Sequence, residues 1–167
     1  VWPEDRTNWS IEANGNPIWM SDSTFTTYDG EKGLKVWGQY DGTYPNITPI
    51  YQGYTLADHG LEPGTMVSAD GMMMSHEDDW IGQGNNVAYL FISFFDESWN
   101  LIHSDFSNYI DSGQPASTWQ FYRVISEIPE GAIYMNLGVE FLQESDQDHG
   151  AVYFDNIRMS LPILDKY

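Results

Sequence analysis

The sequence predicts an all-β protein, a β-sandwich jelly roll of two antiparallel sheets. Short runs rich in β-branched and aromatic residues alternate with turns rich in Gly, Pro, Asn and Asp. No segment keeps a helical periodicity over three turns. The length of 167 residues suits one well-packed domain and is short for two. We therefore expect a single domain over residues 1–167, with its core within about 9–161.

Turn signals divide the chain into short expected strands. In chain order these strands are 9–13, 18–28, 33–40, 47–56, 65–74, 86–96, 118–128, 132–142 and 151–160. The turns between them include Asn14–Pro17, Asp29–Gly30, Asp41–Gly42, Glu62–Gly64, Gly82–Asn85, Ser112–Pro115 and Pro129–Gly131.

Strand 132–142 shows the clearest alternation. Its odd-numbered residues from 133 to 141 are all apolar, whereas the even-numbered ones include Tyr134, Asn136 and Glu140. Successive side chains of a strand point to opposite faces, so one face is predicted to join the core and the other to carry functional groups. Strand 86–96 repeats the pattern, with Tyr89 and Phe91 on its second face.

Strand 151–160 is apolar at its start and is interrupted by one acid, Asp155. A carboxylate in a buried strand needs a partner, which could be a metal ion, an Arg or backbone donors. The residue types alone leave these three alternatives open.

Composition excludes several function classes. The chain holds 25 Asp and Glu against 6 Lys and Arg, a net charge of −19, so we expect no nucleic-acid partner and no binding to anionic lipid. No apolar run approaches the roughly 18–20 residues of a membrane span. The absence of Cys excludes disulfides and thiolate chemistry, and the acidic surface suits a secreted, extracellular protein.

A search for catalytic motifs finds none. The sequence lacks G-x-S-x-G, H-E-x-x-H and a phosphate-binding glycine loop. The cluster His76–Asp79 is interpreted as a solvated acidic loop. A glycosidase needs two carboxylates about 5–10 Å apart, and sequence alone cannot select such a pair among so many acids. We therefore expect a protein that is not itself an enzyme.

The residue types that remain favour sugar binding. Aromatic rings pack against the C–H faces of sugars, while amides, carboxylates and guanidinium groups bind hydroxyls. Arg123 lies in an expected strand and could bridge Glu140 and a ligand hydroxyl. The candidate set is Tyr89, Phe91, Arg123, Tyr134, Asn136 and Glu140 from strands, and the loop aromatics Trp37, Tyr40, Tyr44, Trp80 and Trp99 form a second possible platform.

The chain resembles the jelly-roll carbohydrate-binding modules of families 4, 16 and 22, which are appended to secreted polysaccharide-degrading enzymes. Several short motifs in the expected order carry the resemblance: Ile11-Glu12, Asp29 to Val36, Leu61 to Ala69, Trp119 with the strand after it, and Val152 to Ile157. Gly84 to Leu90 and Phe94-Phe95-Asp96 are similar to segments of accessory modules of marine polysaccharidases.

The resemblance implies a structural calcium ion. Its ligands would be the side chains of Glu12 and Asp155, with carbonyls or acids from Asp29, Glu31 or Lys32. Calcium prefers such hard oxygen ligands, which would give Asp155 a partner.

The resemblance also implies a function: binding a polysaccharide or oligosaccharide without catalysis, so that a covalently linked glycoside hydrolase or lyase is targeted to its substrate. The acidic surface favours a neutral or lightly charged algal or plant glycan. Two alternatives stay open, a small jelly-roll glycoside hydrolase or lyase and a structural β-sandwich without a ligand.

Overall fold

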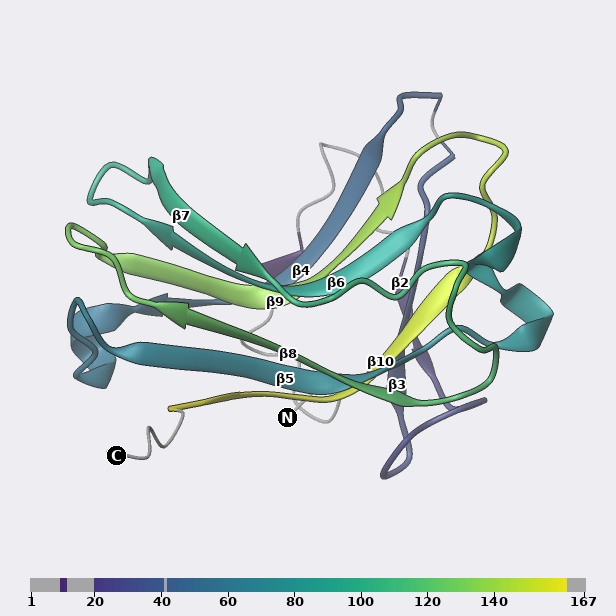
Figure 1. Ribbon diagram of the computed structural model, residues 1–167, viewed down its shortest axis with the longest axis horizontal. Helices are drawn as coiled ribbons and strands as arrows, with labels where there is room; N and C mark the ends of the chain where they lie inside the picture. Colours follow the sequence, from purple (N-terminus) through teal and green to yellow (C-terminus); the bar gives the residue numbers. More distant parts are fainter. Residues whose placement is uncertain (1–9, 12–19, 41, 162–167) are drawn as a thin grey trace.

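Two antiparallel β-sheets pack face to face in the computed structural model, which describes residues 10–11, 20–40 and 42–161 (Figure 1). The first sheet has the strand order β1 (Ser10–Ile11), β4 (Asn46–Thr55), β9 (Tyr134–Gln143), β6 (Val87–Phe95) and β7 (Leu101–Phe106). The second has the order β2 (Met20–Ser23), β3 (Gly33–Trp37), β10 (Ala151–Ser160), β5 (Met66–Met74) and β8 (Gln120–Glu127). The predicted β-sandwich of two antiparallel sheets is confirmed.

Three short 3-10 helices lie in the loops: η1 (Leu56–His59), η2 (Glu77–Asp79) and η3 (Ile81–Gln83). Within the described residues, no helix is long and apolar enough to cross a membrane.

The core fills the space between the sheets, and alternation decides which side chains enter it. Met135, Val139 and Phe141 of β9 are fully buried, as the sequence pattern predicts. Leu90, Ile92 and Phe94 of β6 lie beside them, and Leu34, Val36 and Phe154 face them from the second sheet.

Residues between those core positions point away from the second sheet and form the outer face of the first sheet. Strand pairing sets them in rows, because Glu140 lies opposite Tyr89, Asn136 opposite Ser93, and Tyr134 opposite Phe95. In Figure 1 the first sheet is the upper layer, and its strands stand higher at their ends than in the middle.

The structure differs from the sequence prediction mainly at β7, which was expected to be a loop. Its side chains are exposed or half-buried, so the segment carries little of the apolar signal that marks a strand. The expected strand 18–28 also ends early, at Ser23. Residues 9 and 12–13 of the first expected strand lie outside the described residues.

Candidate functional site

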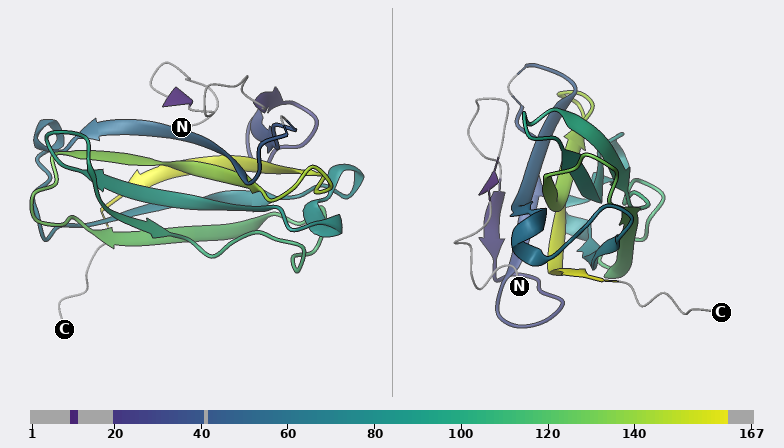
Figure 2. Two further views of the ribbon diagram at one scale, coloured as in Figure 1. Left: turned by 90° about the horizontal axis from the view of Figure 1, so that it is seen from above. Right: turned by 90° about the vertical axis from the view of Figure 1, so that its left-hand side faces the viewer.

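The outer face of the first sheet gathers aromatic side chains, and we call it the aromatic face. Figure 2 (left) looks down onto it, with the long strands β4, β9 and β6 running side by side. Its aromatic residues are Tyr51, Tyr89, Phe91, Phe95, Trp99, Phe106, Tyr109 and Tyr134. Tyr89 and Phe91 are buried, whereas Trp99, Phe106 and Tyr109 are about half exposed. Apolar surface that stays exposed on a folded chain indicates a binding surface.

One aromatic cluster stands at the β6–β7 hairpin. The rings of Trp99 and Tyr134 stack with centroids 4.1 Å apart and an angle of 5° between their planes. The ring of Phe95 is tilted by 46° to that of Trp99, with centroids 5.8 Å apart. Trp99 keeps 56% of its surface exposed, so the stack presents a flat ring to solvent. This geometry suits the apolar face of a planar or ring-shaped ligand.

The turn that carries Trp99 is held by Asp96. The Asp96 carboxylate accepts hydrogen bonds from the backbone N–H of Ser98 (2.8 Å) and Asn100 (2.9 Å), and from the Asn100 side-chain amide (2.9 Å). These bonds, foremost that of the Asn100 side chain, lower the pKa of the Asp96 carboxyl. Trp99 has a φ of 62°, a conformation that the tight turn imposes. The ring is thus fixed before any ligand arrives.

A second aromatic cluster lies further along the face. Tyr89 contacts Phe106 edge-on, with centroids 5.2 Å apart, and Tyr109 at a tilt, with centroids 5.0 Å apart. Ala88 and Ile110 exchange backbone hydrogen bonds of 2.9 and 3.1 Å, which brings Tyr109 beside Tyr89. Phe106 and Tyr109 are about half exposed. The cluster therefore offers a second apolar platform.

A half-buried carboxylate adjoins this second cluster. The Tyr89 hydroxyl donates a short hydrogen bond to Oε1 of Glu140. Burial raises the pKa of Glu140, while the Tyr89 hydrogen bond opposes the rise, and burial together with Glu140 raises the pKa of Tyr89. The Tyr89 hydroxyl therefore stays protonated and donates to Oε1 of Glu140.

Replacing Glu140 with Gln should raise stability at neutral pH. The pKa of Glu140 exceeds its ordinary value of 4.5, so its contribution to stability is fully present below pH 4.5 and is lost as the pH rises through the folded-state pKa. Gln does not ionise and still accepts the Tyr89 hydrogen bond. Thermal unfolding between about pH 4 and about pH 8 should show a Tm advantage for Glu140→Gln that grows with pH. A Tm difference that does not depend on pH would contradict this account.

A polar row separates the two aromatic clusters. It consists of Asn136, Ser93 and Ser104, which lie opposite one another on β9, β6 and β7. The two serine hydroxyls are 2.8 Å apart, whereas the buried Oδ1 of Asn136 has no partner in the described part of the chain. Gly53 lies next to that oxygen, and a Cβ there would come within 3.3 Å of it. Glycine thus avoids a close contact with the amide oxygen.

The aromatic face therefore offers two apolar platforms with polar groups between them. Tyr134 and Glu140 are six residues apart on β9, which places the platforms about 20 Å apart at 3.3 Å per residue. Such a pattern suits an elongated ligand that alternates apolar faces with hydroxyl groups. Five candidates from the sequence meet on this face: Tyr89, Phe91, Tyr134, Asn136 and Glu140.

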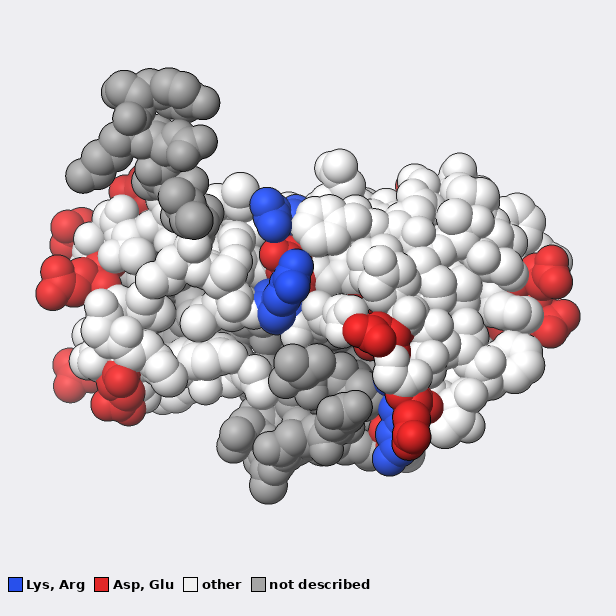
Figure 3. Space-filling model, turned by 90° about the horizontal axis from the view of Figure 1, so that it is seen from below, with Lys and Arg blue, Asp and Glu red and all other residues white. Residues whose placement is uncertain are grey.

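The expected bridge from Arg123 to Glu140 is wrong. Arg123 belongs to β8 and points outward from the second sheet, so it lies on the opposite side of the sandwich from Glu140. Its guanidinium instead binds Oδ2 of Asp70 at 3.1 Å, and Arg158 binds Oδ1 at 2.6 Å. Figure 3 looks onto this side, where basic and acidic side chains meet near the middle. Alternation shows which residues point outward, but not to which sheet a strand belongs.

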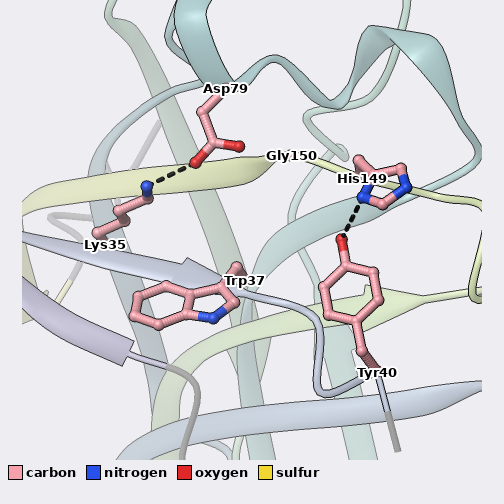
Figure 4. Close-up of a pocket in the computed structure, with 6 residues that line it drawn as sticks. All are labelled: Lys35, Trp37, Tyr40, Asp79, His149 and Gly150. Atoms are coloured by element: carbon pink, nitrogen blue, oxygen red, sulfur yellow. Dashed lines mark hydrogen bonds and ion pairs between the residues drawn. The ribbon is translucent and has the colours of Figure 1, made fainter. Parts of the chain in front are cut away.

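Trp37 lies away from the aromatic face, in an open pocket of ≈ 370 Å³ at the end of β3 (Figure 4). The Lys35 ammonium is 2.5 Å from the Asp79 carboxylate in this pocket, and the Tyr40 ring stacks on His149 with centroids 5.4 Å apart. Partial burial lowers the pKa of Lys35. The hydrogen bond to Asp79 and the negative charge of Asp79 outweigh that effect, so the pKa of Lys35 is raised. The pocket thus has one aromatic wall and one charged wall.

The other two loop candidates join neither surface. Tyr44 is half-buried between β3 and β4, and its buried hydroxyl has no partner in the described residues. Trp80 is half-buried between η2 and η3, and its ring packs on Gly82, where a Cβ would lie 2.1 Å from ring atoms. The expected loop-borne platform is therefore not assembled as one surface, since Trp37 and Tyr40 line one pocket and Trp99 joins the aromatic face.

The predicted calcium ligands are only partly described, because Glu12 lies outside the described residues. Oδ2 of Asp155 accepts hydrogen bonds from the backbone N–H of Tyr28 (2.8 Å) and Asp29 (3.1 Å), so backbone donors partner this acid. Glu31 is exposed, and the Lys32 ammonium is 3.7 Å from Asp22. The described residues hold no group of three or more His, Asp or Glu placed for a metal ion. Calcium stays a prediction.

Sequence reasoning missed part of the aromatic face. Phe106 and Tyr109 were not singled out, and Trp99 was considered only as a loop aromatic. One signal was available, since Asp96 to Asn100 is a turn sequence that follows directly on the strong strand 86–96. A hairpin at this turn brings the next segment back beside β6.

Comparisons with known proteins identify solved structures that share this fold. No protein-family model matches the sequence, and no curated protein matches it. Among solved structures, the enzymatically active domain of tailspike protein 4 from bacteriophage CBA120 is 16% identical, with a TM-score of 0.64 over 95% of this chain and 20% of that one. The C-terminal family 22 carbohydrate-binding module of Clostridium thermocellum Xyn10B is 13% identical, with a TM-score of 0.63 over 95% of this chain and 89% of that one.

A third solved structure holds the CBM22-1 and GH10 modules of Clostridium thermocellum xylanase 10B, complexed with xylohexaose. It is 14% identical, with a TM-score of 0.63 over 96% of this chain and 27% of that one. This chain thus spans less than a third of two of the three structures. At such identities the likeness shows the fold, which is that of the jelly-roll carbohydrate-binding modules, as the sequence resemblance implied.

Proposed function

We propose that this protein binds a polysaccharide on the aromatic face without cleaving it. One observation carries the proposal: two aromatic platforms about 20 Å apart flank a row of polar groups on one curved sheet. Sugar rings pack their C–H faces on Trp99 and on the Tyr89 cluster, while Asn136 and Glu140 accept hydrogen bonds from hydroxyls. An elongated glycan spans both platforms.

The polar acceptors of the face suit hydroxyl donors. The buried Oδ1 of Asn136 lacks a partner within the described residues, so a ligand hydroxyl that reaches it satisfies it without displacing a protein bond. We expect affinity in the micromolar to millimolar range, about −8 to −4 kcal/mol. The net charge of −19 favours a neutral or lightly charged algal or plant glycan.

Absence of catalysis is part of the proposal. The outward positions of β4, β6, β7 and β9 carry a single carboxylate, that of Glu140. Hydrolysis of a glycosidic bond generally requires a pair of carboxyl groups about 5–10 Å apart on the two sides of the scissile bond. A lone carboxylate that is already bonded to Tyr89 suits recognition better than proton transfer.

We also propose that the chain is one module of a secreted polysaccharide-degrading enzyme. The fold likeness to the Clostridium thermocellum structure, which holds a CBM22-1 module together with a GH10 module and xylohexaose, supports this arrangement. The module would hold the linked enzyme on its substrate. Identification of the gene's full reading frame and assay of its product tests the linkage.

A panel of soluble glycans tests the binding directly. Calorimetric titration against xylan, β-glucan, mannan and galactan oligosaccharides should give saturable binding to at least one, with no new reducing ends released. Tyr134→Ala and Glu140→Ala variants that stay folded should lose that binding. Release of reducing ends would favour the hydrolase or lyase alternative, and no response to any glycan would favour a structural role.

The structural calcium ion is a separate part of the proposal. Asp29 and Glu31 belong to the loop whose backbone N–H groups bind Asp155, and their acids together with Glu12 would complete the ligand set. If calcium binds the folded state, chelation with EDTA lowers Tm and added CaCl₂ restores it, because a ligand at 100 times its Kd adds about 2.7 kcal/mol to stability. Equal Tm values with EDTA and with CaCl₂ would exclude the ion and leave the backbone N–H groups as the partners of Asp155.

A further inference from the structure

A second concave feature lies at the edge of the sandwich, beside β8. It is a polar pocket of ≈ 270 Å³ between that strand and the β7–β8 loop. Three amide side chains, Asn108, Gln114 and Gln120, line it together with Tyr109, Tyr122 and Arg123. Pockets for drug-sized ligands span about 300–1,000 Å³, so this one suits a single sugar ring.

Two buried polar atoms in the lining have no hydrogen-bond partner within the described part of the chain. The side-chain nitrogen of Gln120 and the hydroxyl of Tyr122 are both buried without a hydrogen bond to any described residue. Tyr122 is only 7% exposed. Burial and, to a lesser extent, Asp111 raise its pKa to about 12, so the hydroxyl stays protonated and can donate. Buried donors without partners are rare, and an occupant of the pocket would supply the missing acceptors.

The pocket is connected to the aromatic face through one residue. Tyr109 lines the pocket and also packs against Tyr89, with ring centroids 5.0 Å apart. Tyr89 in turn binds Glu140. A ligand lying over the second aromatic cluster therefore passes directly beside the pocket mouth.

The donors in the lining define the chemistry of the occupant. The side chains of Gln120 and Tyr122 offer N–H and O–H groups to an acceptor-rich partner. Sugar hydroxyls and ring oxygens are such acceptors. The amides of Asn108 and Gln114 can both donate and accept, as recognition of a sugar requires.

We infer that this pocket receives a single-sugar side branch of the glycan whose main chain lies on the aromatic face. The inference rests on the proposed function, and it makes the protein selective for branched over linear polymers. The main chain binds the two aromatic platforms, and the branch turns over Tyr109 into the pocket.

Matched pairs of oligosaccharides test this. Each pair shares one backbone: xylohexaose with and without a single arabinosyl branch, and mannohexaose with and without a single galactosyl branch. For the backbone that binds, we expect the branched member to bind about tenfold more tightly, a difference of 1.4 kcal/mol. Gln120→Met, which keeps the length of the side chain but removes the donor, should abolish that preference and leave the linear member's Kd unchanged.

The matched control is Gln147→Met, which removes an exposed amide in the β9–β10 loop and should keep the preference. Equal affinity for both members in the wild type, or a full preference in Gln120→Met, overturns the inference while the proposed function stands. Failure of every member of both pairs and of the wider glycan panel overturns both.

Discussion

Replacing both Arg123 and Arg158 with Met should destabilise the protein by about 3 kcal/mol. Both guanidinium groups bind Asp70, which lies between them on β5 and is only 2% exposed. Met keeps an unbranched chain over the carboxylate but removes both positive partners. A buried charge that loses its partners is strongly destabilising, because no solvent replaces them.

The effect of either single replacement should be smaller. Side chains of Arg123 and Arg158 are 46% and 66% exposed, so water screens each pair, and the remaining Arg still neutralises Asp70. Urea unfolding of the single and double variants measures the difference. Adding Asp70→Asn to the double variant should recover most of the loss, since no buried charge is then left.

Lys32→Met provides the matched control. Lys32 pairs with Asp22 at 3.7 Å on an exposed surface, so its loss should change stability by less than about 1 kcal/mol. A double Arg variant that falls within the same range would contradict the account of Asp70.

Replacing Trp99 with Ala should weaken glycan binding about thirtyfold, or about 2 kcal/mol. Trp99 is the most exposed member of the stack with Tyr134, and the Asp96 turn holds its ring in place. Aromatic residues that are fixed and central to a binding surface commonly carry this much affinity. The variant should fold normally, since the ring is outside the core. Calorimetric titration against the glycan that binds best measures the change in Kd.

Phe25→Ala is the control for Trp99→Ala. Phe25 is 69% exposed but lies in the β2–β3 loop of the second sheet, away from the aromatic face. Its loss should leave Kd unchanged. If Phe25→Ala weakens binding as much as Trp99→Ala does, the ligand lies elsewhere or the effect is nonspecific.

The alternation of inward and outward side chains along each strand made part of the candidate site predictable from the sequence. The even-numbered residues of β9 and the odd-numbered residues of β6 point away from the core, so Tyr134, Asn136, Glu140 and Tyr89 could be grouped as outward residues before the fold was known. Their meeting on one face also requires that the two strands pair, which the structure confirms.

The rest of the candidate site depends on contacts between segments that are distant in the sequence. Arg123 satisfies the same alternation rule as Glu140, but β8 pairs with β5 in the second sheet, so the two side chains lie on opposite faces. Tyr109 reaches the aromatic face only because Ile110 bridges to Ala88. Neither pairing has a local sequence signal, and the exposed strand β7 lacks the apolar alternation that would have revealed it.

The partner of Asp155 was also beyond prediction from the sequence. Its position in an apolar strand correctly indicated that it needs a partner, yet residue type could not choose among a cation, an Arg and backbone donors. The structure supplies N–H groups from Tyr28 and Asp29, a loop more than a hundred residues away along the chain. Such a partner can be found only once the fold is known.

The central claim is that the aromatic face binds the glycan, and chemical-shift mapping tests it most directly. In a titration of the isotope-labelled protein with the best-bound oligosaccharide, we predict the largest shifts at the Trp99 indole N–H and at the amides around Ser93, Ser104 and Asn136. Signals near Arg158 on the opposite sheet should stay in place. Shifts confined to the second sheet, or to the pocket of Trp37 and Tyr40, would contradict the claim.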